Sequence, residues 1–277
     1  MHHITTIADL RAFLCEAPRP VGLVPTMGAL HAGHRGLLDQ ARRDCATVVA
    51  SVFVNPKQFS PQEDFSRYPR PLEHDLAMLE DTRADVAFVP GVDEMYAADF
   101  ATTVAVGGPA LSLEGAVRPG HFDGVATVVA KLFLQAGPDL AYFGQKDGQQ
   151  AAVIKRMAAD LDIPVRVVVM PTVREPDGLA VSSRNAYLTP EQRAAAPILF
   201  RALSASRDLF RAGSQDKAKL EALCRRWLET EPLLEAIDYV AAVDMETMEP
   251  WRGRGPCMLG AAVRIGGVRL IDNVILD

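Results

Sequence analysis

Short apolar runs alternate with amphipathic stretches along the first two thirds of the chain. The runs typical of strands are Val21–Pro25, Thr47–Asn55, Val86–Pro90, Leu140–Gly144 and Val165–Pro171. The stretches between them that predict helices are Gly33–Asp44, Pro71–Arg83, Gly124–Ala136 and Gln149–Leu161. Apolar strands separated by helices indicate an α/β fold, with a Rossmann-like parallel sheet and flanking helices.

The pattern changes at residues 171–190, where Pro, Gly and charged residues indicate a turn-rich hinge. Beyond it, the sequence predicts helices over about 190–212 and 215–230, followed by short strands at Ile237–Val243, Cys257–Val263 and Val268–Ile271. Helices followed by strands favour a smaller α+β domain. We therefore expect two domains: residues 1–172 and residues 173–277, the second acting as a lid.

Composition narrows the possible partners. The 277 residues carry 29 Lys and Arg against 35 Asp and Glu, with no basic stripe, which argues against nucleic-acid binding. An anionic ligand would therefore need a local site. No stretch resembles a signal peptide or a membrane span. The cysteines are far apart, and we expect them to be small buried hydrophobes in a cytoplasmic protein: Cys15, Cys45, Cys224 and Cys257.

Two of the six histidines, His31 and His34, lie three residues apart after the first apolar run. Gly28 and Gly33 surround a predicted helix start, where free backbone N–H groups and the positive helix end favour an anion, phosphate above all. Zinc would need a third protein ligand, and none is evident nearby. The pair alone fits an anion site or a strand-to-helix turn with two partly exposed histidines.

Three other stretches offer groups for a nucleotide or a small polar substrate. In FGQKDGQQ, Lys146 suits phosphate and Asp147 ribose hydroxyls, although Lys-Asp also suits a solvated turn. In SSRN, two hydroxyls and the Arg184 guanidinium suit pyrophosphate, although a capping turn would look the same. In FVNPKQF, neutral amides suit a polar substrate, although Asn-Pro also ends strands.

Taken in order, these motifs resemble the pantoate–β-alanine ligase (pantothenate synthetase) family of the HxGH nucleotidylyltransferase superfamily. The resemblance runs from about residue 4 to the C-terminus. Its most specific parts are PTMGALHAGH, SVFVNPKQF, Tyr68–Arg70, RPGHFDGVATVVAKLF from Arg118, FGQKDGQQ and SSRN. It implies that Mg²⁺ and ATP activate (R)-pantoate as pantoyl adenylate, which β-alanine attacks to give pantothenate and AMP. It also implies a homodimer.

The resemblance assigns residue roles. It implies His34 as the proton donor, with His31, Lys146 and Arg184 as further catalytic groups. The positions matching ATP-binding segments are Met27, Gly28, Ala29, Leu30, His31, Ala32, Gly33, His34, Gly144, Gln145, Lys146, Asp147, Val173, Val181, Ser182, Ser183 and Arg184. The positions matching the pantoate site are Gln58, Gln150, Asn55 and Arg118, and Gln58 is expected to face β-alanine too. No metal ligands are assigned.

The chain departs from the family pattern at three places. Val181 stands where Met or Leu is frequent, and Gln145 stands where Glu is common. His74 stands where an acidic pair is common, which leaves open whether the segment Glu73–Asp75 coordinates Mg²⁺. Other HxGH transferases would share the histidines but lack FVNPKQF and GHFDGV. A class I tRNA synthetase would need a basic RNA-binding domain, and a non-catalytic nucleotide binder would not release pyrophosphate.

Overall fold

The computed structural model describes residues 1–60 and 65–277. The chain divides into two compact units, each described here by itself. Unit 1 comprises Met1–Gly107, Arg118–Gly144 and Val153–Met170, and unit 2 comprises Gly108–Val117, Gln145–Ala152 and Pro171–Asp277. The main passage from one unit to the other lies two residues before the predicted domain boundary. Two earlier segments, 108–117 and 145–152, also group with unit 2.

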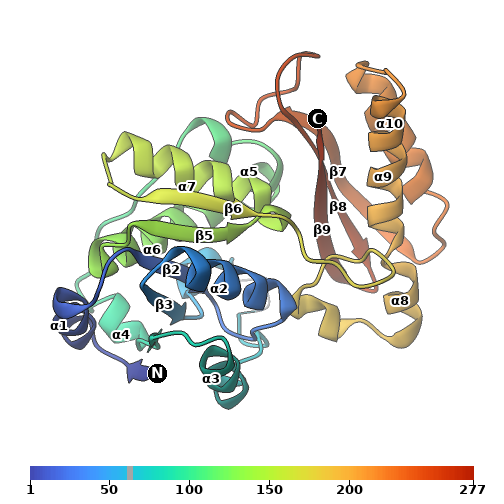
Figure 1. The fold of residues 1–277 in the computed structure, drawn as a ribbon. Helices are drawn as coiled ribbons and strands as arrows, with labels where there is room; N and C mark the ends of the chain where they lie inside the picture. Colours follow the sequence, from blue (N-terminus) through green and yellow to red (C-terminus); the bar gives the residue numbers. More distant parts are fainter. Residues whose placement is uncertain (61–64) are drawn as a thin grey trace. The chain divides into compact units, whose positions relative to one another are not determined.

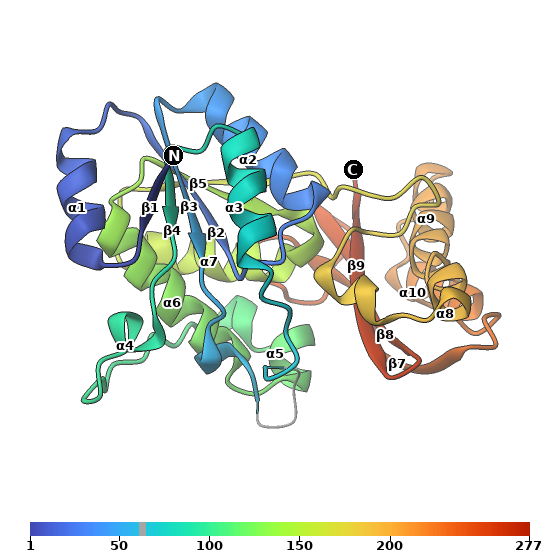
Figure 2. The same cartoon turned by 90° about the horizontal axis from the view of Figure 1, so that it is seen from below.

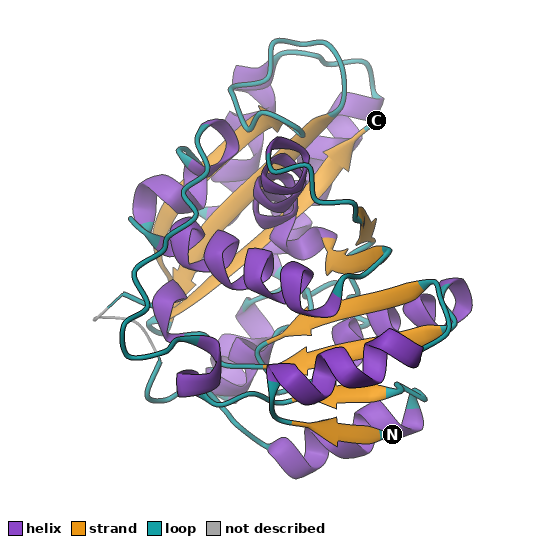
Figure 3. Ribbon diagram, turned by 90° about the vertical axis from the view of Figure 1, so that its left-hand side faces the viewer, coloured by secondary structure: helices purple, strands orange, loops and turns teal. Residues whose placement is uncertain are grey.

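Unit 1 is built on a sheet of parallel strands (Figure 3). The strand order is β1-β4-β3-β2-β5-β6. Its strands are β1 His2–Ile4, β2 Val21–Thr26, β3 Thr47–Val52, β4 Val86–Phe88, β5 Leu140–Gly144 and β6 Arg166–Met170. The central strand β3 is buried at every position, as expected for a parallel strand covered on both faces. The parallel sheet predicted from the sequence is confirmed.

Helices cover both faces of this sheet (Figures 1 and 2). They are α1 Ile7–Glu16, α2 Ala32–Asp44, α3 Leu72–Asp81, α4 Val92–Met95, α6 His121–Ala136 and α7 Gly148–Asp160, the last beginning in unit 2. Right-handed crossovers place α2 and α3 on one face and α1 and α6 on the other. Leu38 of α2 and Leu79 of α3 pack into one core with β2 and β3.

The sheet order also defines where a ligand would bind. Strand β2 pairs with β5, and the connections after these two strands lead to opposite edges of the sheet. Parallel α/β sheets bind ligands at such a switch point, outside the carboxyl ends of the strands. The turn that carries His31 and His34 follows β2 at this edge.

Unit 2 contains an antiparallel sheet with the order β7-β8-β9. Helices α9 and α10 lie side by side along one face of this sheet (Figure 1). The strands are β7 Leu234–Asp244, β8 Cys257–Ile265 and β9 Val268–Leu276. The helical segments are η2 Gly108–Ala110, α5 Leu113–Val117, η3 Gln145–Asp147, η4 Ser183–Tyr187, α8 Pro190–Ala195, α9 Ile198–Arg211 and α10 Lys217–Leu228. The α+β character predicted for the C-terminal region is confirmed.

Several sequence predictions need correction. The helix predicted over 190–212 is two helices, because Pro197 lacks the N–H that would continue α8 and instead precedes the first residue of α9. Strand β9 extends five residues past the predicted Ile271, and β1 and α1 were not predicted. Cys15 is exposed, whereas the other three cysteines are buried as expected, and all four are free thiols.

Gly124 of α6 allows this helix to approach the short helix η1 (Pro56–Gln58), because a Cβ there would overlap the backbone carbonyl of Lys57. We expect Gly124→Ala to lower the free energy of unfolding by about 1–3 kcal/mol through overpacking. Urea denaturation measures the change. Gly107→Ala is the matched control, since its Cβ would meet no neighbour, and a change within about 0.5 kcal/mol is expected. An equal effect of both substitutions would contradict this close approach.

Candidate active site

The turn after β2 has an unusual backbone. Gly28 and Ala29 both have positive φ angles, 80° and 50°. The left-handed conformation is accessible to Gly but costs about 1 kcal/mol or more for Ala. Thr26 supports the turn, because its hydroxyl donates to the Ser51 carbonyl at 2.7 Å and accepts from the Gly28 N–H at 3.1 Å. The turn is therefore tied to β3 before helix α2 begins.

Asp75 of α3 fixes the remainder of this turn. Its two carboxylate oxygens accept the N–H groups of Ala29 and Leu30 at 2.9 and 2.7 Å, and the residue is 1% exposed. Hydrogen bonds to an ionised acceptor are stronger than neutral ones, so this contact can hold a strained backbone. The sequence did not identify this role, since Asp75 lies 45 residues or more away and was considered only for Mg²⁺.

His31 and His34 cap helix α2 reciprocally. His31 is the N-cap residue, and its Nδ1 accepts the Gly33 N–H at 3.2 Å. Nδ1 of His34 accepts the His31 N–H at 3.3 Å, and the two ring centroids lie 4.1 Å apart. In a neutral imidazole whose Nδ1 accepts a hydrogen bond, the proton resides on Nε2. The caps thus set both rings in the tautomer that offers Nε2–H as a donor.

This arrangement corrects one detail of the expected anion site. The sequence predicts free backbone N–H groups at this helix start, but those of His31 and Gly33 each donate to a histidine ring nitrogen. Capping satisfies these donors because the side chains lie closest to them. The donors that this corner has for an anion are consequently the imidazole Nε2–H groups rather than these backbone amides.

The predicted amides of FVNPKQF lie together in unit 1. Asn55 is 1% exposed, and its amide nitrogen donates to Gln58 Oε1 at 3.1 Å and to the Gly124 carbonyl at 3.0 Å. The hydroxyl of Tyr96 donates to Asn55 Oδ1 at 2.8 Å, and burial raises the Tyr96 pKa, which keeps the phenol protonated. Asn55 therefore orients Gln58, whose Nε2 donates to Met27 Sδ at 2.8 Å.

His121, at the start of α6, links Arg118 to the backbone carbonyl of Gln58. Arg118 donates from Nη1 to His121 Nε2 at 3.0 Å, and His121 Nδ1 lies 2.8 Å from the Gln58 carbonyl. Because an arginine only donates and a carbonyl only accepts, the imidazole carries its proton on Nδ1. Unit 1 thus brings together Met27, Asn55, Gln58 and Arg118. Sequence reasoning quoted the motif around His121 but gave this residue no role.

In unit 2, the loop at 145–147 is fastened to β9. The side-chain nitrogen of Asn273 donates to the carbonyls of Gln145 and Lys146 at 2.8 and 3.0 Å. The Gln145 amide donates to Asn273 Oδ1 at 3.0 Å. Lys146 Nζ lies 3.2 Å from Asp147 Oδ1, and its side chain is 21% exposed. Asn273 was not predicted, since it lies 127 residues beyond Lys146.

The predicted residues of the hinge region also meet within unit 2. The Val181 N–H donates to the Val173 carbonyl at 3.0 Å, and Ser182 caps η4 by accepting the Arg184 N–H at 3.4 Å. The neighbouring Arg174 forms a two-pronged ion pair with Asp272, which is 4% exposed. Asp272 and Asn273 are adjacent, so one point of β9 contacts both the hinge segment at Arg174 and the loop that carries Lys146.

Gln150 lies in the first turn of α7, next to the buried Gln149. Gln149 is 5% exposed, accepts the Glu114 N–H at 2.9 Å, and donates to the carbonyls of Pro109 and Ser112 at 2.8 and 2.7 Å. Glu114 in turn pairs with Arg269 of β9 at 2.6 and 2.8 Å. These contacts explain why segments 108–117 and 145–152 group with unit 2. They set the backbone from which the partly buried Gln150 side chain projects.

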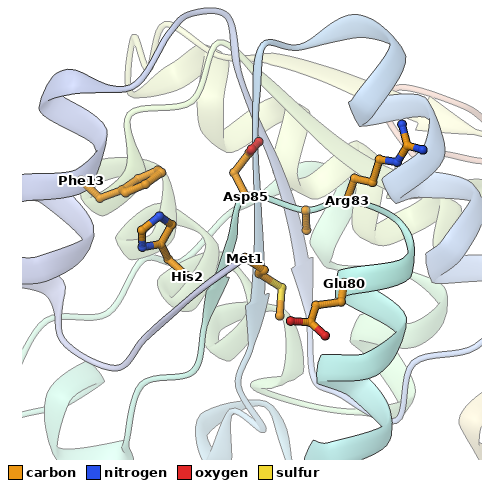
Figure 4. A pocket seen from close by; sticks show the side chains of 7 residues that line it. Met1, His2, Phe13, Glu80, Arg83 and Asp85 are labelled. Carbon is orange, nitrogen blue, oxygen red and sulfur yellow. The ribbon is translucent and has the colours of Figure 1, made fainter.

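Two further features bear on ligands. Among residues 1–60 and 65–277, no three His, Cys, Asp or Glu side chains form a group suited to a metal ion. A hollow of about 410 Å³ in unit 1 is lined by His2, Phe13, Glu80, Arg83 and Asp85, among others (Figure 4). It lies where β1 and β4 begin, at the edge opposite the histidine turn, so it is not part of the candidate site.

Fold and site together define a class. A parallel α/β sheet with an HxGH turn at its switch point, and a separate lysine loop and Ser-Ser-Arg segment, are features of a nucleotide-binding enzyme that handles phosphate groups. The family model described as pantoate-beta-alanine ligase matches residues 2–275. The chain belongs to this family, and it is a ligase.

Relatives and solved structures agree with this assignment. The chain is 51% identical to a pantothenate synthetase of Roseiflexus sp. (strain RS-1), with 100% of both chains covered, and 52% identical to one of Pelotomaculum thermopropionicum, covering 98% and 97%. A pantothenate synthetase structure from Thermus thermophilus matches with a TM-score of 0.94 at 51% identity, covering 99% of both chains. A pantoate-beta-alanine ligase from Francisella tularensis, complexed with beta-gamma ATP and beta-alanine, matches with a TM-score of 0.81 at 31% identity, covering 100% and 98%.

The carboxylate of Asp75 leads to a prediction. In Asp75→Asn, one oxygen still accepts an N–H, but the amide NH₂ faces the second N–H, donor against donor. A buried donor left unpaired costs about 1–3 kcal/mol, so we expect the ligase kcat/KM for ATP to fall about 10- to 100-fold. Steady-state kinetics measures this. Asp81→Asn on the same helix, at an exposed side chain, is the control; kinetics of Asp75→Asn equal to those of this control would contradict the role.

Proposed function

We propose that this chain joins (R)-pantoate to β-alanine at the expense of ATP, through a pantoyl adenylate, releasing AMP and pyrophosphate. The observation that carries the proposal is the capping of α2, where the Nδ1 atoms of His31 and His34 accept backbone N–H groups. This gives the switch point two neutral Nε2–H donors, which suits a reaction that moves charge onto phosphate oxygens.

The proposed reaction requires the protein to position the reactants and to stabilise the charge that develops. A carboxylate that attacks the α-phosphorus is already ionised at pH 7, so the first step needs no general base. The protein must align the reactants and stabilise negative charge on the phosphoryl oxygens and on the leaving pyrophosphate. A site closed to water would protect the adenylate until the amine of β-alanine attacks its carbonyl carbon and AMP leaves.

We assign the roles as follows. In unit 1, His34 and His31 donate to phosphate oxygens, and Gln58 binds pantoate and faces β-alanine. Arg118 and Asn55 belong to the same pantoate site. The buried hydrogen bonds of Asn55 support a role in which it orients Gln58. In unit 2, the phosphates of ATP are neutralised by Lys146 and Arg184 together with the hydroxyls of Ser182 and Ser183. Gln150 binds pantoate.

Mg²⁺ is part of the proposal as the companion of ATP. This ion keeps several waters and is commonly held by substrate phosphates with one or two carboxylates. Both oxygens of Asp75 accept backbone N–H groups, so this carboxylate does not fit as a ligand. Mg²⁺ would supply neutralisation of phosphate charge, and we propose that it enters the site held by the phosphates of ATP.

Location and assembly complete the proposal. No helix within the described residues is long and apolar enough to span a membrane, and all four cysteines are free thiols. Free, scattered cysteines are typical of a reducing compartment, which supports a cytoplasmic location. The homodimer and the lid role of the C-terminal region rest on the family resemblance and on hinge composition.

Pyrophosphate release is the direct test. With Mg²⁺-ATP and pantoate, we expect release of pyrophosphate that depends on pantoate and requires no β-alanine. Addition of β-alanine should then produce AMP and pantothenate in equal amounts, measured by chromatography. Release that ignores pantoate, or that occurs only with a different acceptor, would point to another HxGH transferase, and nucleotide binding without any release would point to a non-catalytic binder.

A pair of substitutions separates capping from chemistry at His34. In His34→Asn, the amide oxygen replaces Nδ1 as acceptor for the His31 N–H, but the Nε2–H donor is lost. We expect both His34→Asn and His34→Ala to lower kcat at least about 100-fold, the loss typical of a transition-state donor, with His34→Asn keeping wild-type thermal stability. The exposed His3→Asn is the control. Near-normal turnover in His34→Asn would remove His34 from the catalytic groups.

A further inference from the structure

Asn273 lies on β9, far in sequence from every motif that points to ATP, yet it holds the loop that carries Lys146. Its side chain is 5% exposed, and its nitrogen donates to two consecutive backbone carbonyls, those of Gln145 at 2.8 Å and Lys146 at 3.0 Å. Carbonyl oxygens only accept hydrogen bonds, so the amide orientation is set by these partners. The amide nitrogen must face the loop, and Oδ1 must face away from these carbonyls.

The orientation of the Asn273 amide determines whether the side chain at position 145 must donate or accept a hydrogen bond. Because Oδ1 can only accept, its partner must be a donor, and the Gln145 amide meets this need at 3.0 Å. A Glu at this position would bring an acceptor to an acceptor. The Gln145 side chain thus matches the amide that fixes its own backbone, which gives a physical reason for the departure from the common Glu.

The backbone of Asn273 is itself held rigidly by its neighbours. Its N–H donates to Asp272 Oδ1 at 2.8 Å, and Asp272 forms a buried ion pair with Arg174. Burial without solvent competition makes such a network stiff when every member is paired. The position of the Lys146 backbone is therefore determined by β9 through one side chain.

We propose that Asn273 is a positioning residue for Lys146: it fixes the loop backbone so that the ammonium group meets the phosphates of ATP. The inference rests on the proposed function, in that Lys146 binds ATP phosphates. Asn273 contacts the loop and is not assigned a contact with substrate. Its removal takes the Asn273 donor away from two partly buried carbonyls and frees the loop to move.

Binding of Mg²⁺-ATP measured by isothermal titration calorimetry tests the proposal with four proteins: wild type, Lys146→Ala, Asn273→Ala and the double variant. We expect Asn273→Ala to raise Kd about tenfold, since three side-chain hydrogen bonds are lost: two to backbone carbonyls and one from the Gln145 amide. If Asn273 acts through Lys146, its removal matters little once Lys146 is gone, and the double variant should bind within about twofold of Lys146→Ala. Multiplied effects, or an unchanged Kd in Asn273→Ala, would overturn the proposal.

Three further variants keep the result interpretable. Ser206→Ala also removes a buried side-chain donor to a backbone carbonyl in unit 2, since Ser206 Oγ donates to Leu220 at 2.9 Å, and it should alter stability without altering Kd. Asn273→Asp places a carboxylate against both carbonyls and should weaken ATP binding at least as much as Asn273→Ala. Gln145→Glu loses the side-chain bond alone and should weaken binding less than Asn273→Ala, by about threefold or less.

Failure of the inference is distinguishable from failure of the proposed function. If wild-type protein does not bind Mg²⁺-ATP, or if Lys146→Ala binds as wild type does, the assignment of Lys146 fails. If Lys146→Ala weakens binding and Asn273→Ala does not, only the positioning role fails. A loss of folded protein in Asn273→Ala, seen by circular dichroism, shifts the decision to Asn273→Asp and Gln145→Glu, whose order of effect must then follow the one stated.

Discussion

A buried carboxylate that accepts two adjacent backbone N–H groups holds the histidine turn of unit 1, and the rest of the candidate site in that unit depends on it. The turn at Gly28–Leu30 has two consecutive left-handed residues, one of them an alanine, and such a backbone persists only where its surroundings impose it. Asp75 imposes it from α3 with both oxygens. Because His31 follows directly, the start of α2 and the tautomers of both histidines inherit that geometry.

In unit 2, a buried side chain also holds a functional backbone segment, but it donates hydrogen bonds where Asp75 accepts them. Where Asp75 offers acceptors to two N–H groups, Asn273 offers donors to two carbonyls. In both cases the holding residue is at most 5% exposed, so the unmet polar groups would otherwise be costly. In each unit, a buried side chain from elsewhere in the chain therefore fixes the backbone that carries the candidate phosphate-binding groups.

The candidate site residues could be named from the sequence because their signals are local. The histidine pair, Gln58, Lys146 and Ser182 lie in short motifs after apolar runs, and the parallel sheet follows from the alternation of those runs with helices. Asp75, His121 and Asn273 act across 45 to 128 residues of chain, and no periodicity records such a partnership. The first strand has three residues, too few for a pattern, and Pro197 was missed as the point where one predicted helix becomes two.

The two polar departures from the family pattern can now be understood through their neighbours. His74 is next to Asp75 on α3, but its side chain is 62% exposed, whereas that of Asp75 is 1% exposed and accepts both N–H groups of the turn. A carboxylate at 75 is therefore what the turn requires, and the exposed His74, whose Nδ1 lies 3.6 Å from Asp75 Oδ1, makes neither of the two bonds to the turn. Gln145 differs, because its partner Asn273 is oriented by the loop backbone and accepts a donor there. The exposed position lies outside the bonds that hold the turn, and the position facing Asn273 is matched to its partner.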